Sequence, residues 1–321
     1  MKALLIINPI SGTSSKEGLD KYVTDTLTPL GWEIDVAFTQ GHNEATRLAR
    51  EAVAAGYQAV LAAGGDGTVN EVAAALRDTD TSLGIIPCGS GNGLARHAGI
   101  PVGMREGVEV IKEKNIVPAD YMTVNGLPCF CTFGVGFDAA VSAAFARHKR
   151  RGKFTYLKST FETYRNYKPE LYTIEVNGEI ISERAFLVAV CNASQYGNNA
   201  YIAPHASITD GLLDVTVIHN GNTLTTALVG VDLLTGMLEK NALIDTLRTP
   251  ELKITRTNPG AVHIDGEPME LGNEIIIKCH PGKLKLFLPT KQQDFTPFIT
   301  PISALLSDLR VMINKIVNPL N

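Results

Sequence analysis

The sequence contains few cysteines, five in 321 residues, and has neither a Cys-x-x-Cys pair nor a Cys/His group at metal-binding spacing. An odd number of cysteines without such spacing argues against a disulfide framework and against a zinc site. Most of the five lie inside apolar runs. We therefore expect buried free thiols in a protein of the reducing cytoplasm.

Long apolar runs and a strong net charge are also missing. No run reaches the roughly 18 apolar residues that cross a bilayer, and the segment MKALLIINP turns polar too early for a signal peptide. The formal net charge is only −4, which disfavours wholesale electrostatic binding to nucleic acid. If the protein meets lipid, we expect it to do so from the membrane surface.

Residues 1–122 alternate between strand-like and helix-like segments. The strand-like runs ALLIIN, WEIDVAFT, AVLAAGG and LGIIP each precede a polar or glycine-rich turn. This pattern is typical of a Rossmann-like α/β domain with a mostly parallel sheet and helices on both faces. Ligands bind such sheets at the carboxyl ends of the strands. Those ends carry Asn8, Pro9, Thr39, Gly64–Thr68 and Gly89–Gly93.

Residues 123–290 follow a different pattern. Asn-Gly pairs at 125–126 and 177–178 lie between strand-like runs, which is a strong hairpin signal. Further strand-like runs follow, interrupted by helix-like stretches near 142–165 and 223–240. We predict a second domain in which two antiparallel sheets form a β-sandwich.

The tail, residues 291–321, places apolar side chains on one helical face between Ile302 and Val317. We expect a helix that packs back on the N-terminal domain. An in-plane membrane helix is the alternative, although its polar face is not rich in Lys or Arg.

The segment AAGGDGTVNEV contains a glycine-rich turn between a strand and a helix, a place where backbone N–H groups can hold phosphate. Asp66 puts a negative charge in that turn. The spacing matches neither a dinucleotide fingerprint nor a Walker loop. A structural Asp capping the following helix is the alternative, but Thr68 or Asn70 would be better placed as a cap. We favour a chemical role for Asp66.

Two further motifs of the N-terminal domain follow strands. NPISG, residues 8–12, forms an ordinary turn as readily as a ligand loop. In PCGSGNGLARH, residues 87–97, Ser90 and Asn92 lie among glycines and offer hydrogen bonds to an anion or a ribose. We interpret His97 as a helix-surface histidine.

The motif HIDGEPM, residues 263–269, contains an Asp-Gly pair that is typical of a turn. We expect this turn to carry Asp265 and Glu267 at the edge of the β-rich domain. The remaining histidines receive no role: His42, His148, His205, His219, His263 and His280.

Taken together, the motifs resemble the catalytic domain of the diacylglycerol kinase family, which includes sphingosine kinases, ceramide kinases and bacterial lipid kinases. Seven strings occur in the family's order: NPISG, GGDGTVNEV, PCGSGNGLAR, PADYMTVNG, GVGFDAAVS, ASITDGLLDV and HIDGEPM. The resemblance implies an ATP site in the cleft between an α/β domain and a β-sandwich domain. It also implies a cytoplasmic enzyme, peripherally associated with the inner face of the membrane, that phosphorylates a lipid hydroxyl.

Matching positions carry the family's roles to this sequence. Asp66, Glu267 and Asp120 match acidic positions needed for catalysis, and Asp138 matches a substrate head-group position. A magnesium site is implied at Ser207, Asp210 and Leu212, with backbone oxygens helping. The implied nucleotide contacts are Asn8, Pro9, Thr39, Gly65, Asp66, Gly67, Thr68, Ser90, Asp265 and Glu267.

A lipid kinase has a use for a carboxylate beside phosphate. The acceptor hydroxyl must lose its proton as the new P–O bond forms, and a positioned base typically contributes about 10²–10⁴-fold. Mg²⁺ would offset the repulsion between Asp66 and the ATP phosphates. Asp66 would either take the proton or hold metal or water, and Glu267 is the rival base.

Other interpretations remain open at this stage. NAD kinases and phosphofructokinases also carry a GGDG turn, so a different small-molecule acceptor is possible on the same N-terminal fold. A non-catalytic lipid or nucleotide sensor is a third interpretation. The basic run 147–153 is either a solvated helix end or a site of attraction for phosphates or anionic lipid. The identity of the lipid acceptor and a possible homodimer stay undetermined.

Overall fold

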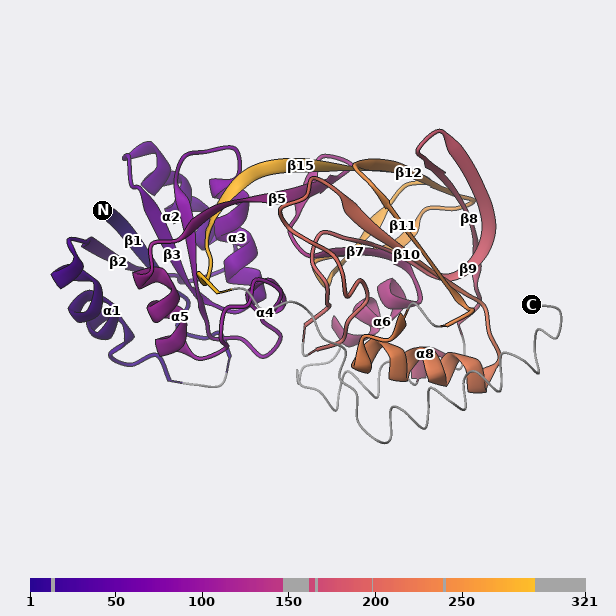
Figure 1. The fold of residues 1–321 in the computed structure, drawn as a ribbon, viewed down its shortest axis with the longest axis horizontal. Helices are drawn as coiled ribbons and strands as arrows, with labels where there is room; N and C mark the ends of the chain where they lie inside the picture. The colour runs from indigo at the N-terminus through magenta and orange to yellow at the C-terminus, as the bar shows by residue number, and fades with distance from the viewer. Residues whose placement is uncertain (13–14, 147–161, 165–166, 198, 239–240, 292–321) are drawn as a thin grey trace.

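The computed structural model describes the chain except for residues 13–14, 147–161, 165–166, 198, 239–240 and 292–321. It consists of two lobes joined by two long strands, β5 (Ile116–Val124) and β15 (Glu274–Phe287), which run side by side from one lobe to the other (Figure 1). The basic run 147–153 and the amphipathic segment 302–317 lie outside the described residues.

The N-terminal lobe is the predicted α/β domain. Its parallel strands lie in the order β4-β3-β1-β2, and the end of β15 pairs with β4. The strands are β1 (Lys2–Ile7), β2 (Glu33–Phe38), β3 (Ala59–Gly64) and β4 (Ser82–Pro87). The helices are α1 (Leu19–Leu27), the 3₁₀ turn η1 (Thr28–Leu30), α2 (Glu44–Ala54), α3 (Asp66–Leu76), α4 (Gly93–His97) and α5 (Met104–Lys112).

The central strands of this sheet, β3 and β4, are buried on both faces. Successive side chains of a strand point to opposite faces, as β1 shows. Leu5 and Ile7 belong to a cluster with α1 and α5, whereas Ile6 belongs to a cluster with α2 and α3. Strands buried on both faces read as continuous apolar runs. This explains why the central strands were recognisable in the sequence.

The start of α2 is capped from another helix. Asn43 makes no side-chain cap for α2. Glu71 of α3 does so instead, because its carboxylate accepts from the N–H groups of Asn43 and Ala45 at 3.0 and 3.1 Å. Helix α3 begins at Asp66 itself, without a side-chain cap. Neither Thr68 nor Asn70, which we considered better placed than Asp66, caps this helix.

The C-terminal lobe is an antiparallel β-sandwich with helices below it in the view of Figure 1. Its remaining strands are β6 (Leu127–Cys129), β7 (Thr132–Gly136), β8 (Glu170–Val176), β9 (Glu179–Cys191), β10 (Leu213–His219), β11 (Ile244–Thr249), β12 (Glu251–Arg256), β13 (Gly260–Ile264) and β14 (Glu267–Leu271). Its helices include α6 (Phe137–Ala146) and α8 (Thr223–Thr235).

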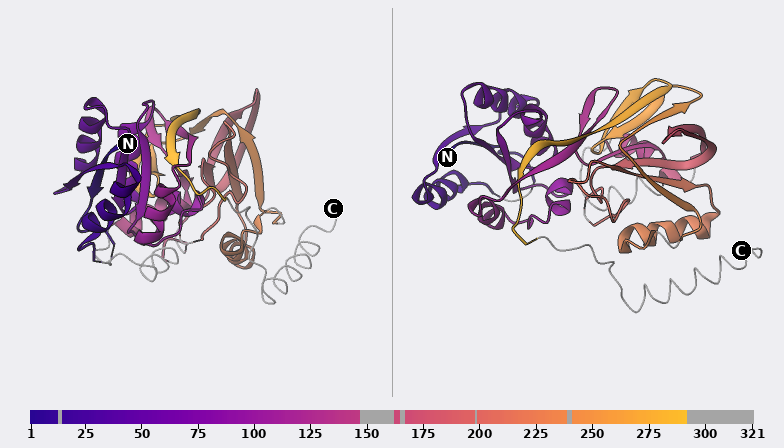
Figure 2. Two further views of the ribbon diagram at one scale, coloured as in Figure 1. Left: turned by 60° about the vertical axis from the view of Figure 1, so that its left-hand side comes forward. Right: turned by 45° about the horizontal axis from the view of Figure 1, so that its top comes forward.

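Long strands connect the layers of the sandwich. The first half of β9 pairs with β8 and its second half pairs with β7 and β10, so one strand belongs to both layers. Figure 2 shows the two lobes in two turned views. Buried side chains from β5, β7, β8, β9, β10, β12 and β15 fill the space between them. The apolar runs 273–279 and 283–289 look like two strands in the sequence, but they form the single strand β15, which continues through an irregularity between His280 and Leu284.

Two predictions from composition can be checked in the fold. All five cysteines are free, and four of them are buried. Within the described ranges, no helix has the length and apolar character needed to cross a membrane.

Candidate active site

The carboxyl ends of the parallel strands meet at one edge of the N-terminal lobe. The side-chain amide of Asn8, after β1, donates to Oγ1 of Thr68 in α3 at 2.9 Å. The Asn8 backbone N–H donates to Ala63 of β3, and that of Thr39 donates to Ile7 of β1, both at 2.9 Å. The structure therefore brings together the N-terminal residues predicted to contact nucleotide.

The glycine-rich turns at this edge touch backbone to backbone. A Cβ added to Gly89 would lie 2.7 Å from the Gly65 Cα and 2.9 Å from the Asn92 Oδ1. A Cβ added to Gly12 would lie 1.7 Å from the carbonyl oxygen of Cys88. These turns need glycine because any side chain would force them apart. Between them, Ser90 and Pro9 are exposed.

We expect Gly89→Ala to lower the free energy of unfolding by about 1–3 kcal/mol, because overpacking against rigid backbone costs that much. Gly67→Ala is the matched control, since an added Cβ there meets nothing within 4 Å. Chemical denaturation of both variants checks this. Equal stability of the two would show that the turns can separate without cost.

Asp66 caps a helix other than its own. Its two carboxylate oxygens accept from the backbone N–H groups of Asn92 at 2.9 Å and Gly93 at 2.6 Å, which begin α4. A carboxylate at a helix N-terminus is favoured by the unpaired N–H groups and by the helix dipole. Asp66 thus clamps the GGDG turn onto the PCGSGN turn. Each oxygen accepts one bond in this arrangement, so each keeps a further lone pair.

Helix α4 also ties the two lobes together. The Arg96 guanidinium donates to the carbonyl of Gly91 at 2.9 Å and to the side chain of Asn199, in the other lobe, at 3.3 Å. Nδ1 of His97 accepts from the backbone N–H of Ser194 at 3.1 Å and lies 3.0 Å from its hydroxyl.

His97 is therefore not the surface histidine we expected. Burial lowers its pKa to about 4, which keeps the imidazole neutral near neutral pH. Only a neutral ring can accept at Nδ1. The contact with Ser194 depends on that state, so His97 fixes α4 against the C-terminal lobe.

The carboxylate of Asp265 is bound by the protein's own backbone. It accepts from the N–H groups of Phe130, Cys131 and Thr132 at 2.9, 2.7 and 3.1 Å, and from the Cys129 thiol at 3.2 Å. Burial raises the pKa of this carboxyl, and the hydrogen bonds oppose that rise. These contacts give Asp265 a structural role and do not support its assignment to the nucleotide.

Cys131 links the acidic turns of the two lobes. Burial raises the pKa of its thiol well above the usual value, and the charges of Asp265 and then Asp66 raise it further. Its backbone N–H donates to Asp265 at 2.7 Å, and its carbonyl accepts from the N–H groups of Asn192 and Ala193 at 2.9 and 3.0 Å. A Cβ added to Gly93, whose N–H binds Asp66, would lie 3.8 Å from the carbonyl oxygen of Gln195 in the same segment.

Glu267 is the acidic residue of this turn that remains available. Asp265 and Gly266, with φ of 51° and 83°, form the predicted two-residue turn, and Glu267 follows it at the start of β14 opposite Ile264. Its side chain is exposed and makes no hydrogen bond or ion pair with any residue that the structure describes.

Asp138 is buried, with 8% of its surface exposed. Its carboxylate accepts from the N–H of Ala139 at 2.7 Å and from the Tyr196 hydroxyl at 2.9 Å, and it lies 3.1 Å from Nε2 of His263. The contacts favour a positioning role: Asp138 holds His263, two residues before Asp265. His263 received no role from the sequence, although it stands in the HIDGEPM motif.

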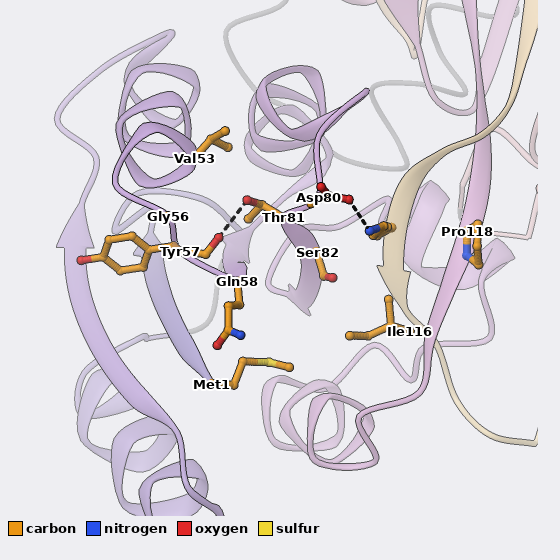
Figure 3. Close-up of a pocket in the computed structure, with 11 residues that line it drawn as sticks. Met1, Val53, Gly56, Tyr57, Gln58, Asp80, Thr81, Ser82, Ile116 and Pro118 are labelled. Carbon is orange, nitrogen blue, oxygen red and sulfur yellow. Dashed lines mark hydrogen bonds and ion pairs between the residues drawn. The ribbon is translucent and has the colours of Figure 1, made fainter.

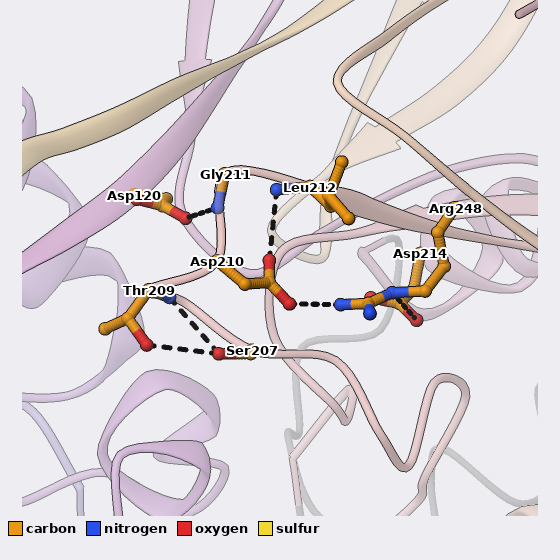
Figure 4. Close-up of polar contacts among 8 residues, drawn as sticks. All are labelled: Asp120, Ser207, Thr209, Asp210, Gly211, Leu212, Asp214 and Arg248. Carbon is orange, nitrogen blue, oxygen red and sulfur yellow. Dashed lines mark hydrogen bonds and ion pairs between the residues drawn. The ribbon is translucent and has the colours of Figure 1, made fainter.

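Asp120 and the predicted magnesium residues form a second group, beside β5 (Figure 4). The Asp120 carboxylate accepts from the N–H groups of Gly211 and Gly282, each at 2.7 Å. Asp120 is buried, and each of its carboxylate oxygens already accepts a hydrogen bond from a turn. This indicates a structural role. Within the turn, the Ser207 hydroxyl lies 3.2 Å from Oγ1 of Thr209.

Asp210 is also engaged. Its Oδ1 accepts from the N–H of Leu212 at 3.0 Å, and its Oδ2 accepts from the Arg248 guanidinium. Mg²⁺ requires oxygen ligands in a near-octahedral arrangement. Ser207 bonds to Thr209, and the Asp210 carboxylate bonds to Leu212 and to the Arg248 guanidinium. These residues therefore do not fit a magnesium site.

The segment 192–197 was missed by the sequence analysis, although Ser194 and Gly197 contact the N-terminal lobe at His97 and Gly91. The buried side-chain amide of Asn192 donates to the carbonyls of Asp120 and Phe130, both at 3.0 Å. A Cβ added to Gly197 would lie 3.3 Å from Gly91. The polar string CNASQYG after a strand was the available signal.

Comparisons with known proteins agree with this architecture. Residues 2–124 match the family model of the diacylglycerol kinase catalytic domain, and residues 131–288 match the YegS C-terminal NAD kinase beta sandwich-like domain. A "Probable lipid kinase YegS-like" from Xanthomonas oryzae pv. oryzae is 32% identical over 298 residues, covering 87% of this chain and 94% of that one. This chain belongs to the family of YegS-like lipid kinases.

Other relatives extend the likeness. A Pseudomonas syringae protein of the same description is 29% identical over 305 residues, covering 90% of this chain and 93% of its own. A crystal structure of a diacylglycerol kinase from Bacillus anthracis aligns with a TM-score of 0.70 at 19% identity, covering 90% of this chain and 97% of its own. Another structure from the same strain reaches 0.74 at 24% identity, covering 90% and 98%. These structural likenesses show the fold.

The lipid kinase also has a depression of about 610 Å³ at the other edge of its N-terminal sheet (Figure 3). Met1, Gln58 and Ser82, which line it, stand at or next to the amino ends of β1, β3 and β4. Ligands of open α/β sheets bind at the carboxyl ends. This cavity is therefore distinct from the candidate active site.

Proposed function

We propose that this lipid kinase transfers the γ-phosphoryl group of ATP to a hydroxyl of a diacylglycerol-like or sphingoid-like lipid. The observation that carries the proposal is the series of contacts from the GGDG turn of one lobe, through α4 and the 192–197 segment, to the Cys131 backbone that binds Asp265. Together with membership of the family, this convergence supports a reaction centre between the lobes.

ATP would bind along the strand-end edge. The N–H groups of Gly67 and Thr68 lie in the first turn of α3, where a helix leaves its donors without internal partners. Such donors, with the helix dipole, bind phosphate oxygens. The exposed Ser90 hydroxyl lies on the neighbouring turn. Asn8 supports this surface by holding Thr68.

Asp66 and Glu267 would have different roles in the transfer. Asp66 already accepts hydrogen bonds from α4 on both oxygens, so we assign it to holding the phosphate-binding turns in place. Glu267, which is exposed and free of partners among the described residues, is assigned to removing the proton of the acceptor hydroxyl. Mg²⁺ bound with ATP would supply charge neutralisation, for which Asp66 keeps lone pairs.

The acceptor would come from a membrane surface, because a lipid substrate resides there. Peripheral contact with the inner face of the membrane, rather than insertion, is therefore part of the proposal.

An acceptor screen tests the proposed function. We expect label from γ-labelled ATP to enter the lipid fraction with one or more of diacylglycerol, monoacylglycerol, sphingosine, ceramide or phosphatidylglycerol in micelles, and not to enter NAD. The Glu267→Gln variant is the control that assigns the transfer to this site. Label on NAD would favour an NAD kinase, and ATP binding without transfer to any acceptor would favour a sensor.

A further inference from the structure

The turn that matches the family's magnesium position lies against an arginine. Asp214, at the start of β10, pairs across the ladder with Arg248 of β11. The Arg248 Nε lies 3.3 Å from Asp214 Oδ1, and the other end of the guanidinium contacts Asp210. One planar cation thus bridges two carboxylates, as Figure 4 shows.

Burial makes a counter-charge necessary at this point. Asp214 is mostly buried, with 15% of its side chain exposed, and its Oδ2 has no partner among the described residues. A second carboxylate stands beside it on Asp210. Two neighbouring carboxylates repel each other and are costly to desolvate unless a cation pairs with them. In this chain that cation is the side chain of Arg248.

We propose that the Arg248 guanidinium takes the place of a divalent cation at the 207–214 turn. The Gly211 N–H of this turn donates to the carboxylate of Asp120, a residue of β5, which runs from one lobe to the other. With Arg248 as the resident cation, this arrangement does not depend on free Mg²⁺. The inference is independent of the proposed transfer reaction, because it concerns the architecture of the β-sandwich lobe.

Titration of the nucleotide-free protein with Mn²⁺ tests the inference. Binding is measured from the electron paramagnetic resonance signal of the Mn²⁺ that stays free. We expect the unmodified protein and Asp210→Asn to bind Mn²⁺ identically. Arg248→Met should gain a site, because it frees oxygens of Asp210 and Asp214, and the double variant with Asp210→Asn should lose it. Arg184→Met is the matched control and should gain nothing, because Arg184 is exposed and bonds only to a backbone carbonyl among the described residues.

Thermal unfolding provides a second measurement. The unmodified protein and Arg184→Met should unfold at the same temperature in EDTA and in Mg²⁺. Arg248→Met should unfold at a lower temperature in EDTA and recover in Mg²⁺. The inference is overturned if Asp210→Asn removes a Mn²⁺ site from the unmodified protein, or if Arg248→Met gains no site. If Arg248→Met does not fold, the comparison of Mn²⁺ binding between the unmodified protein and Asp210→Asn still tests the inference.

Discussion

Glu267→Gln should reduce turnover by about 10²–10⁴-fold while leaving the dissociation constant for ATP nearly unchanged. The loss follows from the chemistry of the acceptor: its hydroxyl holds its proton at neutral pH, and an amide cannot remove it, whereas a positioned carboxylate can. The ATP affinity should survive because Glu267 lies on the hairpin of the C-terminal lobe and supports none of the glycine-rich turns. Steady-state kinetics with a saturating lipid acceptor and equilibrium ATP binding measure the two quantities.

Glu270→Gln is the matched control for this prediction. Glu270 is exposed on the same strand, β14, and the substitution changes the local charge equally. If both variants lose activity alike, the cause is the charge of the strand and not a base. If Glu267→Gln keeps full turnover, Glu267 is not the base.

Asp66→Asn should weaken ATP binding as well as turnover. The carboxylate accepts from two backbone N–H groups of the next turn. An asparagine supplies one acceptor and turns an NH₂ group toward the other N–H. A hydrogen bond to a charged group contributes about 1.5–3 kcal/mol. We expect the free energy of unfolding to fall by about 2 kcal/mol and the dissociation constant for ATP to rise about tenfold or more.

Chemical denaturation and equilibrium ATP binding measure these effects, with Asp25→Asn, an exposed helix substitution, as the control for charge. The prediction separates a clamp from a pure catalyst. An Asp66→Asn protein that retains full stability and ATP affinity but has lost turnover would instead make Asp66 a base or a metal ligand.

Much of the fold could be predicted because local chemistry decides it. Strands buried on both faces require apolar runs, and the Asn-Gly pairs at 125–126 and 177–178 take the positive φ values of hairpin turns, 47° and 84° in the first and 51° and 82° in the second. The ends of the parallel strands follow from the order of the elements alone, so the nucleotide edge could be predicted as a group. The boundaries of the helices were harder, because Glu71 caps α2 from a different helix.

The role of each individual carboxylate could not be predicted from the sequence. Asp66, Asp120, Asp138, Asp265 and Glu267 all looked alike as acidic residues in family motifs. In the structure the first four accept hydrogen bonds from their own chain, and Glu267 is left without a partner in the described part of it. Which carboxylate is satisfied depends on backbone N–H groups that lie far away in the sequence.

The amino-acid sequence by itself determined the two-lobe architecture, the family and the edge at which phosphate would bind, because these depend on periodicity, turn chemistry and motif order. Only the tertiary structure decided that His97 is a neutral acceptor at the lobe interface, that Arg248 pairs with Asp210, and that Glu267 has no side-chain partner among the described residues. The physical reason is that protonation, ion pairing and hydrogen bonding are set by neighbours in space, and those neighbours come from segments that the chain brings together only on folding.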